Sequence, residues 1–195
     1  MPYPRKYESN LTLRDGTQLL IRPIRPDDIE LEREFIMGLS DESSFYRFFS
    51  VRHEPTLEMV RELCNVDYEK QMAFVAEAKV RGRNVFIGVA RIMESTEKRA
   101  EMAIVVSDDY QGKGLAAKLM TVLLEFAGDR GFASVYALIL PENAPMINLA
   151  KKFGFQVKHS EDKLVIAELT MRSQAGSPVP ESRLKKSRMK KSGPY

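Results

Sequence analysis

The sequence has few of the residues on which disulfide frameworks and metal centres depend. Its 195 residues include one cysteine, Cys64, and two histidines, His53 and His159. A single cysteine excludes an internal disulfide and any zinc site built from cysteines. Two histidines are too few for a multi-histidine metal centre, so we expect no metal.

Long apolar runs are also missing. No stretch approaches the roughly 18 consecutive apolar residues that a membrane-spanning helix needs, and residues 1–8 lack the apolar segment of a secretory signal. We therefore expect a soluble, cytoplasmic protein without a membrane partner. The apolar share of 44% is nevertheless typical of a folded domain, and the length suits one domain of ordinary size.

The net charge of +3 is unevenly distributed along the chain. Residues 173–195 hold six lysines or arginines and one acid, Glu181, so they carry +5 and leave residues 1–172 at about −2. The segment lacks an apolar period, which predicts a folded domain over 1–172 and a disordered basic tail over 173–195. A basic tail could contact nucleic acid, but a slightly acidic body argues against a nucleic-acid-binding domain, and we expect no such partner.

Apolar periodicity predicts an α+β domain. An extended run at 19–22 precedes helices that start near residues 26, 40 and 55. Short connections then make three strands antiparallel neighbours, at 72–79, 84–93 and 100–106. The rest comprises a helix at 114–130, a strand at 133–140, a helix at 145–153 and strands at 155–159 and 163–171. This order describes a mixed sheet with one strand–helix–strand crossover in its middle.

The crossover begins with a glycine-rich loop, Gln111 to Ala116 (QGKGLA). Such a loop between a strand and a helix binds phosphate, because small residues let the backbone approach and the N–H groups of the first helical turn donate to the anion. Lys113 would favour the same anion. A Walker loop is excluded because Gly114 follows Lys113, and a Rossmann loop because five residues separate the strand from the first glycine.

This loop resembles the Q/R-x-x-G-x-G/A pyrophosphate loop of the Gcn5-related N-acetyltransferases (GNAT family). The segment from Asn143 to Phe155 is similar to that family's N-x-x-A-x-x-L-Y-x-x-x-G-F element. The resemblance covers about residues 18–170. It implies a GNAT fold, with a mixed, mostly antiparallel sheet of about six to seven strands flanked by helices. That sheet would be splayed open between strands 100–106 and 133–140, with the cosubstrate acetyl-CoA in the gap.

The resemblance also implies roles for individual residues. Backbone groups of strand 104–106 would pair with the pantetheine arm, the N–H groups of 112–116 would hold the pyrophosphate, and Asn143 would meet the pantetheine or brace the wedge. The predicted cofactor-binding residues are therefore Ile104, Val105, Val106, Gln111, Gly112, Lys113, Gly114, Leu115, Ala116 and Asn143.

Segments before the glycine-rich loop resemble one type of protein within this family. Residues 3–28 and 43–49 look like the acetyltransferase part of bacterial protein lysine acetyltransferases of the Pat type, whose implied partners are proteins with an accessible lysine, notably AMP-forming acyl-CoA synthetases. Many of those proteins carry a further fused domain that does not fit in 195 residues, so we expect a stand-alone form. The oligomeric state stays open.

Lysine, with a pKa of about 10.4, is protonated at pH 7, so its attack on a thioester needs a base. The candidate is Glu101, an acid on an otherwise apolar strand that should flank the thioester. The tyrosine that often protonates the departing thiolate in this family is replaced by Ala150. Tyr110 or a water could substitute, and the thiol pKa near 8.5 makes the thiolate a tolerable leaving group.

The sequence leaves rival functions open. One is acetylation of a small amine such as a polyamine or an aminoglycoside, which many acids in the acceptor cleft would favour; a shallow open cleft would favour a protein. Another is a non-catalytic acyl-CoA sensor, favoured by Ala150 and opposed by Glu101. The aromatic segment 45–49 lines an acceptor site or belongs to the core, and Cys64 is expected in the core.

Overall fold

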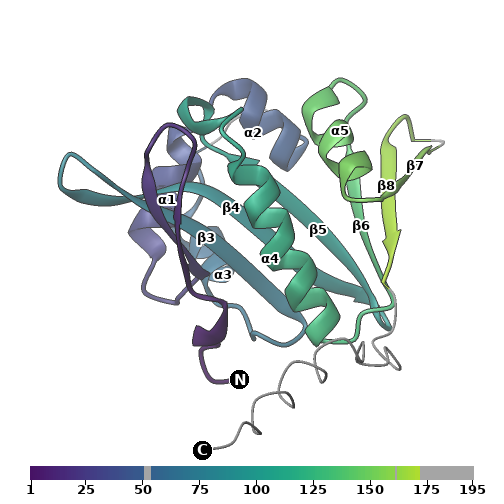
Figure 1. The fold of residues 1–195 in the computed structure, drawn as a ribbon, viewed down its shortest axis with the longest axis horizontal. Helices are drawn as coiled ribbons and strands as arrows, with labels where there is room; N and C mark the ends of the chain where they lie inside the picture. Colours follow the sequence, from purple (N-terminus) through teal and green to yellow (C-terminus); the bar gives the residue numbers. More distant parts are fainter. Residues whose placement is uncertain (51–53, 161, 172–195) are drawn as a thin grey trace, which may run out of the picture.

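The computed structural model describes residues 1–50, 54–160 and 162–171, which form one sheet with helices on both faces (Figure 1). The strands are β1 (Ser9–Thr12), β2 (Gln18–Pro23), β3 (Gln71–Val80), β4 (Arg83–Thr96), β5 (Arg99–Val106), β6 (Ser134–Ile139), β7 (Gln156–His159) and β8 (Val165–Thr170). The helices are α1 (Ile29–Gly38), α2 (Asp41–Phe48), α3 (Leu57–Cys64), α4 (Leu115–Asp129) and α5 (Ala144–Lys152), with 3₁₀ turns η1 (Arg5–Tyr7) and η2 (Asp108–Tyr110). The predicted tail, 173–195, lies outside the described residues, and so does His53.

The sheet has the strand order β1-β2-β3-β4-β5-β6-β8-β7, and β5–β6 is its one parallel pair within the described chain. The predicted α+β class with a mixed, mostly antiparallel sheet is confirmed, as are the antiparallel neighbours β3, β4 and β5. The sheet has eight strands instead of the six to seven expected. The unpredicted strand is β1, whose side chains are exposed apart from a half-buried Leu11. It has no apolar alternation that periodicity could detect, and pairing with β2 defines it.

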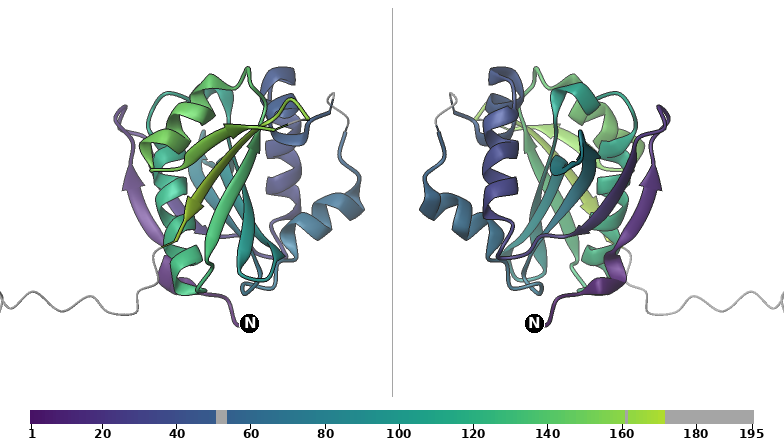
Figure 2. Two further views of the ribbon diagram at one scale, coloured as in Figure 1. Left: turned by 90° about the vertical axis from the view of Figure 1, so that its right-hand side faces the viewer. Right: turned by 90° about the vertical axis from the view of Figure 1, so that its left-hand side faces the viewer.

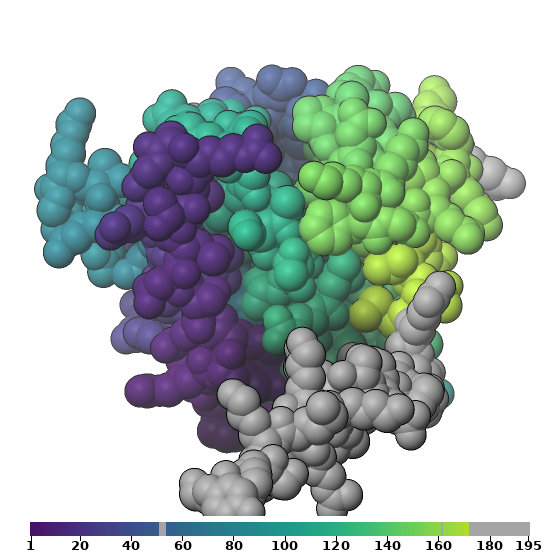
Figure 3. Space-filling view, viewed as in Figure 1, coloured from purple at the N-terminus to yellow at the C-terminus, as the bar shows by residue number. Residues whose placement is uncertain are grey.

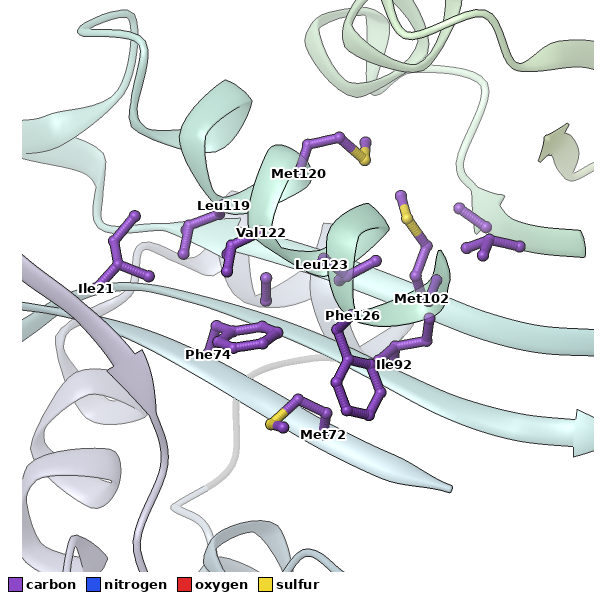
Figure 4. Packing of buried hydrophobic residues seen from close by; sticks show 14 of the residues in the cluster. Ile21, Met72, Phe74, Ile92, Met102, Leu119, Met120, Val122, Leu123 and Phe126 are labelled. Carbon is purple, nitrogen blue, oxygen red and sulfur yellow. The ribbon is translucent and has the colours of Figure 1, made fainter. Parts of the chain in front are cut away.

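Helices lie on both faces of the sheet (Figure 2), and each face carries an apolar layer. One face packs against α4 and α5, and the other against α1 and α3. Figure 4 shows the first layer, where Phe126 of α4 meets Phe74 of β3 edge to face with ring centroids 6.1 Å apart. Along β5, Met102 faces α4 and Val105 faces the α1 layer, because successive strand residues point to opposite faces.

The sheet splits between β5 and β6. The two strands pair only where Arg99–Glu101 lies beside Ser134–Tyr136, and beyond Glu101 they diverge (Figure 1). Both strands continue, β5 to Val106 and β6 to Ile139. The predicted splay between these strands is therefore present, and Glu101 is the last paired residue before it opens.

The N-terminal segment supports α4 from outside. Asp129, at the end of α4, accepts hydrogen bonds from Lys6 (2.5 Å) and from the hydroxyl of Tyr7 (2.7 Å). In Figure 3 the surface of α4 is recessed between this segment and α5. None of the helices in the described ranges has the length and apolar content required to cross a bilayer.

Candidate active site

Glu101 lies half-buried at the closed end of the splay. The parallel register places Tyr136 of β6 directly beside it, and the Tyr136 hydroxyl donates a 3.0 Å hydrogen bond to Glu101 Oε2. With Val105, Glu101 shares the sheet face that packs against α1 and α3. The carboxylate is thus positioned where an acceptor approaching from that face would meet a ligand between the strands.

Three side chains around Tyr136 restrict its position. The guanidinium carbon of Arg99 lies 3.8 Å from the centroid of the Tyr136 ring. Arg99 also donates to Glu168 Oε1 at 2.9 Å, and the hydroxyl of Ser134 donates to the same oxygen at 3.0 Å. The hydrogen bond from Arg99 is the main cause that lowers the pKa of Glu168. This network keeps Glu168 ionised and holds Arg99 against the ring.

Charged residues from three other elements face Glu101. Arg91 of β4 donates to Glu32 of α1 and to the carbonyl of Leu63, both at 2.6 Å. Arg47 of α2 lies over the ring of Phe48, 4.9 Å from its centroid, and forms no hydrogen bond or ion pair with any described residue. Burial lowers the pKa of Arg47 to about 10, and the charge of Arg91 adds to this, while Glu32 and Glu101 oppose it. Arg47 therefore remains cationic at neutral pH.

The glycine-rich loop follows β5 and leads into α4. Gly112 and Gly114 have φ of +72° and +89°, values that residues with a side chain rarely adopt. A Cβ at either position would meet no atom within 4 Å, so the space beside the loop is open. Within the described structure, none of the backbone N–H groups from Gly112 to Ala116 donates a hydrogen bond. These N–H groups at a helix N-terminus form an arrangement that suits an anion.

A cluster of side chains holds the loop against α2. Asp108 accepts hydrogen bonds from the N–H and hydroxyl of Ser40 (2.9 and 2.7 Å) and from the hydroxyl of Ser43 (2.8 Å). Gln111 donates from its side-chain amide to Ser43 Oγ (3.0 Å) and to the carbonyl of Val106 (3.1 Å). Gln111, which the sequence assigned to cofactor binding, thus braces the loop in this structure.

Lys113 is held by a carboxylate. Its ammonium forms a 2.9 Å ion pair with Asp15, in the turn between β1 and β2, and lies 4.7 Å from the centroid of the Tyr110 ring. The hydrogen bond from Lys113 lowers the pKa of Asp15, and the Thr17 N–H acts in the same direction. The role of Lys113 toward a phosphate stays a prediction, and in that role it would exchange one anion for another.

The remaining residues predicted to bind the cofactor lie on β5, at the start of α4 and after β6. Leu115 is buried and anchors the start of α4. The Ile104–Val106 stretch of β5 has no strand on its β6 side, although the Val106 carbonyl already accepts from Gln111. Asn143 Oδ1 accepts from the N–H of Met146 at 3.1 Å and so caps α5. The predicted role of Asn143, to meet the pantetheine or to brace the wedge, stays a prediction.

Three other residues that the sequence singled out offer no reactive group at the splay. Ala150 is fully buried in α5 and offers no hydroxyl. Cys64 lies in the core, where burial raises the pKa of its thiol to about 12 and suppresses the reactive thiolate. His159 is exposed on β7. In the part of the chain that the structure describes, no group of three or more His, Cys, Asp or Glu side chains could hold a metal ion.

The sequence reasoning missed Tyr136, Arg99, Glu168 and the separate importance of Arg47. The first three come together only through the β5–β6 and β6–β8 registers, which depend on pairing between distant segments. The strand that carries Tyr136 is a nearly continuous apolar run without alternation, and nothing local specified which residue of β5 Tyr136 faces.

A sheet that opens after an acidic residue, with an unpartnered glycine-rich loop at a helix N-terminus beside the opening, defines an acyl-CoA-type N-acetyltransferase. Comparison with known families agrees, since residues 18–156 match the model described as "Acetyltransferase (GNAT) domain". The chain belongs to the GNAT acetyltransferase family and is an N-acetyltransferase. Enzymes of this family use acetyl-CoA.

Two named proteins and one solved structure are each more than 30% identical to this chain. "Acetyltransferase PA5475" of Pseudomonas aeruginosa is 36% identical over 152 residues, which cover 77% of this chain and 82% of that protein. "Acetyltransferase Pat" of Mycolicibacterium smegmatis is 31% identical over 144 residues, 73% of this chain but only 42% of that longer protein. The crystal structure of the GNAT domain of S. lividans PAT has a TM-score of 0.78 and 31% identity, covering 87% of this chain and 99% of that domain.

A small-molecule enzyme is also among the relatives. The spermidine N(1)-acetyltransferase of Escherichia coli K12 is 26% identical over 147 residues, 71% of this chain and 73% of that protein. The predicted family and its Pat-type similarity are thus confirmed. The acceptor has to be argued from the site.

Proposed function

We propose that this protein transfers an acetyl group from acetyl-CoA directly to lysine side chains of other proteins, with Glu101 as the general base. The observation that carries the proposal is the position of Glu101, the last paired residue before β5 and β6 diverge. A ligand entering the splay from the loop of α4 would reach this carboxylate at the closed end.

The reaction needs few groups from the protein. Glu101 takes a proton from the lysine ammonium, and the free amine nitrogen forms a bond to the acetyl carbonyl carbon as the carbon–sulfur bond breaks. The nitrogen gives up its second proton to solvent as the amide forms. Coenzyme A leaves as a thiolate and takes a proton from solvent, since a thiol pKa near 8.5 requires no dedicated acid. The unpartnered N–H groups of Gly112–Ala116 would bind the pyrophosphate.

The charges around Glu101 favour a protein over a polyamine. Arg47 lies on the acceptor side without an ion-pair partner among the described residues, and the acids Glu32 and Glu168 are each paired with an arginine. A polycation would therefore meet positive charge beside the base. The hollows of about 430 and 160 Å³ lie at β1–β3 and between α1 and β4, and Glu101 lines neither.

Further elements of the proposal rest on the family alone. Its protein partners include AMP-forming acyl-CoA synthetases, the reaction takes place in the cytoplasm, and neither a metal nor a nucleic acid takes part. The similarity to proteins named Pat and PAT supports the protein acceptor.

The test is acetylation of candidate proteins by the purified enzyme, read by mass spectrometry. An acyl-CoA synthetase, a mixture of unrelated proteins, spermidine and an aminoglycoside are each incubated with acetyl-CoA and either wild type or Glu101→Gln. The proposal predicts lysine acetylation that depends on Glu101. Faster acetylation of spermidine or the aminoglycoside than of every protein would refute the protein acceptor.

A further inference from the structure

Of the five charged side chains that lie around Glu101 (Glu32, Arg47, Arg91, Arg99 and Glu168), four form two ion pairs. Arg91 is bound to Glu32, and Arg99 to Glu168. Glu101 receives only the neutral hydroxyl of Tyr136, and Arg47 has no polar partner among the described residues. One carboxylate and one guanidinium therefore remain available on this face.

Arg47 has few alternatives within the protein. Glu32 is almost fully buried, and one of its oxygens, Oε2, lacks a hydrogen-bond partner. The charge of Glu32 is nevertheless already balanced by Arg91 at 2.6 Å. The five N–H donors of Arg47 therefore have no acceptor among the described residues, and the half-buried guanidinium can donate to a ligand that supplies one.

Helix α2 carries Arg47 across the opening of the splay (Figure 1). Its first turn is bound to the β5 side, where Ser40 and Ser43 donate to Asp108. Farther along, the hydroxyl of Tyr46 reaches the carbonyl of Glu142, which follows β6, at 3.5 Å. Arg47 is one turn after Ser43, so it projects from the same side of the helix as the contact with β5.

Exposed apolar side chains lie on β4 and α2, elements beside these two groups. Met93, the β4 neighbour of Glu101 in the register, is 50% exposed. Phe45, in the middle of α2, and Phe49, at its C-cap, are 42% and 43% exposed. An extended protein segment has side chains to cover such residues, whereas a small amine does not. The surface therefore fits an acceptor that continues on both sides of its reactive lysine.

We propose that Arg47 selects the acceptor by binding a carboxylate beside the reactive lysine, so that the preferred substrate is a protein segment with an acidic residue close to that lysine. The inference rests on the proposed function. The lysine amine would meet Glu101 and the acidic side chain would meet Arg47, which satisfies both unpaired groups at once. Guanidinium and carboxylate form paired, charge-assisted hydrogen bonds, which is why arginine suits this role better than lysine.

The test compares peptides that contain one lysine, are blocked at both ends, and differ at a single neighbouring position. That position carries glutamate, glutamine or arginine and is moved from two residues before the lysine to two residues after it. Wild type, Arg47→Gln and Arg47→Glu are assayed for kcat/KM, and acetyl-CoA affinity is measured by calorimetry. Arg61→Gln is the matched control, because Arg61 is exposed on α3 and loses the same charge.

Wild type and Arg61→Gln are expected to prefer the best glutamate peptide over its glutamine counterpart by about tenfold or more. Arg47→Gln should lose this preference with unchanged acetyl-CoA affinity, and Arg47→Glu should prefer the arginine peptide. That reversal is a readout which a purely structural role would not produce.

Three results would overturn the inference. These are equal rates on all peptides by wild type, a glutamate preference that persists in Arg47→Gln, and an equal loss of acetyl-CoA binding in Arg47→Gln and Arg47→Glu. Free amino acids, which also carry an amine and a carboxylate, form a separate arm, and faster acetylation of these would contradict the protein segment. If wild type acetylates no peptide or protein but does acetylate spermidine, the proposed function itself fails, and the preference fails with it.

Discussion

Glu101 depends on its neighbours for its orientation. A single hydroxyl, from Tyr136, holds one carboxylate oxygen, while Arg99 stacks on the ring that carries this hydroxyl. The other oxygen, Oε1, accepts no hydrogen bond from the described residues. A carboxylate fixed by one oxygen and open at the other has the geometry that a general base requires, because a base acts only within hydrogen-bond reach of the proton that it accepts.

Removal of the Tyr136 hydroxyl should therefore leave the Glu101 carboxylate less firmly oriented without affecting the cofactor site. We expect Tyr136→Phe to lower kcat about tenfold, because small displacements of a catalytic group have large effects on rate. Acetyl-CoA affinity should stay within twofold in calorimetry. Tyr3→Phe removes a hydroxyl bound to Glu8, away from the site, and serves as control. Unchanged kcat in Tyr136→Phe would show that the hydrogen bond has no catalytic role.

At the scale of elements, the site depends on how the loop before α4 is shaped and held. Two glycines at positive φ shape the loop, the space beside their Cα atoms is open, and the N–H groups from Gly112 to Ala116 bond to no described residue. Asp108 and Gln111 then attach this loop to α2, the helix that carries Arg47. The loop that would bind the cofactor and the helix that would bind the acceptor are therefore connected through side chains.

New carboxylates in the loop should repel the pyrophosphate at close range. We expect Gly112→Asp combined with Gly114→Asp to weaken acetyl-CoA binding at least a hundredfold in calorimetry. Gly82→Asp is a matched control, because Gly82 also has a positive φ (+82°) and open space but lies in the turn between β3 and β4. Equal affinity in the double variant and the control would reject this loop as the pyrophosphate site.

The stability that the contact between Asp108 and α2 contributes should depend on pH. Burial raises the pKa of Asp108, but hydrogen bonds from Ser40 and Ser43 outweigh it, so the pKa is lowered overall. A lowered pKa stabilises the fold above the unfolded value of about 3.9 and loses this effect as the pH falls through the folded value. Asp108→Asn should cost about 1 kcal/mol of unfolding free energy at pH 7.

Urea unfolding of wild type and Asp108→Asn between pH 7 and pH 3 tests this link. The difference between the two proteins should be constant down to about pH 5 and shrink below pH 4. Asp109→Asn, which changes the next carboxylate of the same turn, should differ little from wild type. A difference that grows toward acid pH would contradict the assigned direction.

At the scale of the whole molecule, local patterns predicted the elements but not all their contacts. The apolar stripe of α4 and the antiparallel order of β3 to β5 follow from periodicity and short connections. Strand β1 was missed because its side chains have no apolar face. Tyr136 was missed because the parallel register brings together segments separated by α4.

The unpaired state of Arg47 could not be predicted for a related reason. Six charged residues from α1, α2, β4, β5 and β8 surround the acceptor side, namely Glu32, Arg47, Arg91, Arg99, Glu101 and Glu168. Which of them pair is decided by packing over long sequence separations. The residues and the family motif can be identified from the sequence, but which charged side chains pair with one another depends on the fold.

The central claim, that Glu101 is the base for acetyl transfer to lysine, is tested most directly by the pH dependence of Glu101→Gln turnover on an acceptor protein or peptide. The variant keeps the shape of the side chain but loses its basicity. At pH 7 the rate should fall by about 10²–10⁴, or roughly 3–5 kcal/mol of barrier, with unchanged affinity for acetyl-CoA. It should recover partly as the pH approaches about 10, where free lysine amine is plentiful. Normal turnover at pH 7, or a joint loss of folding and acetyl-CoA binding, would contradict the account.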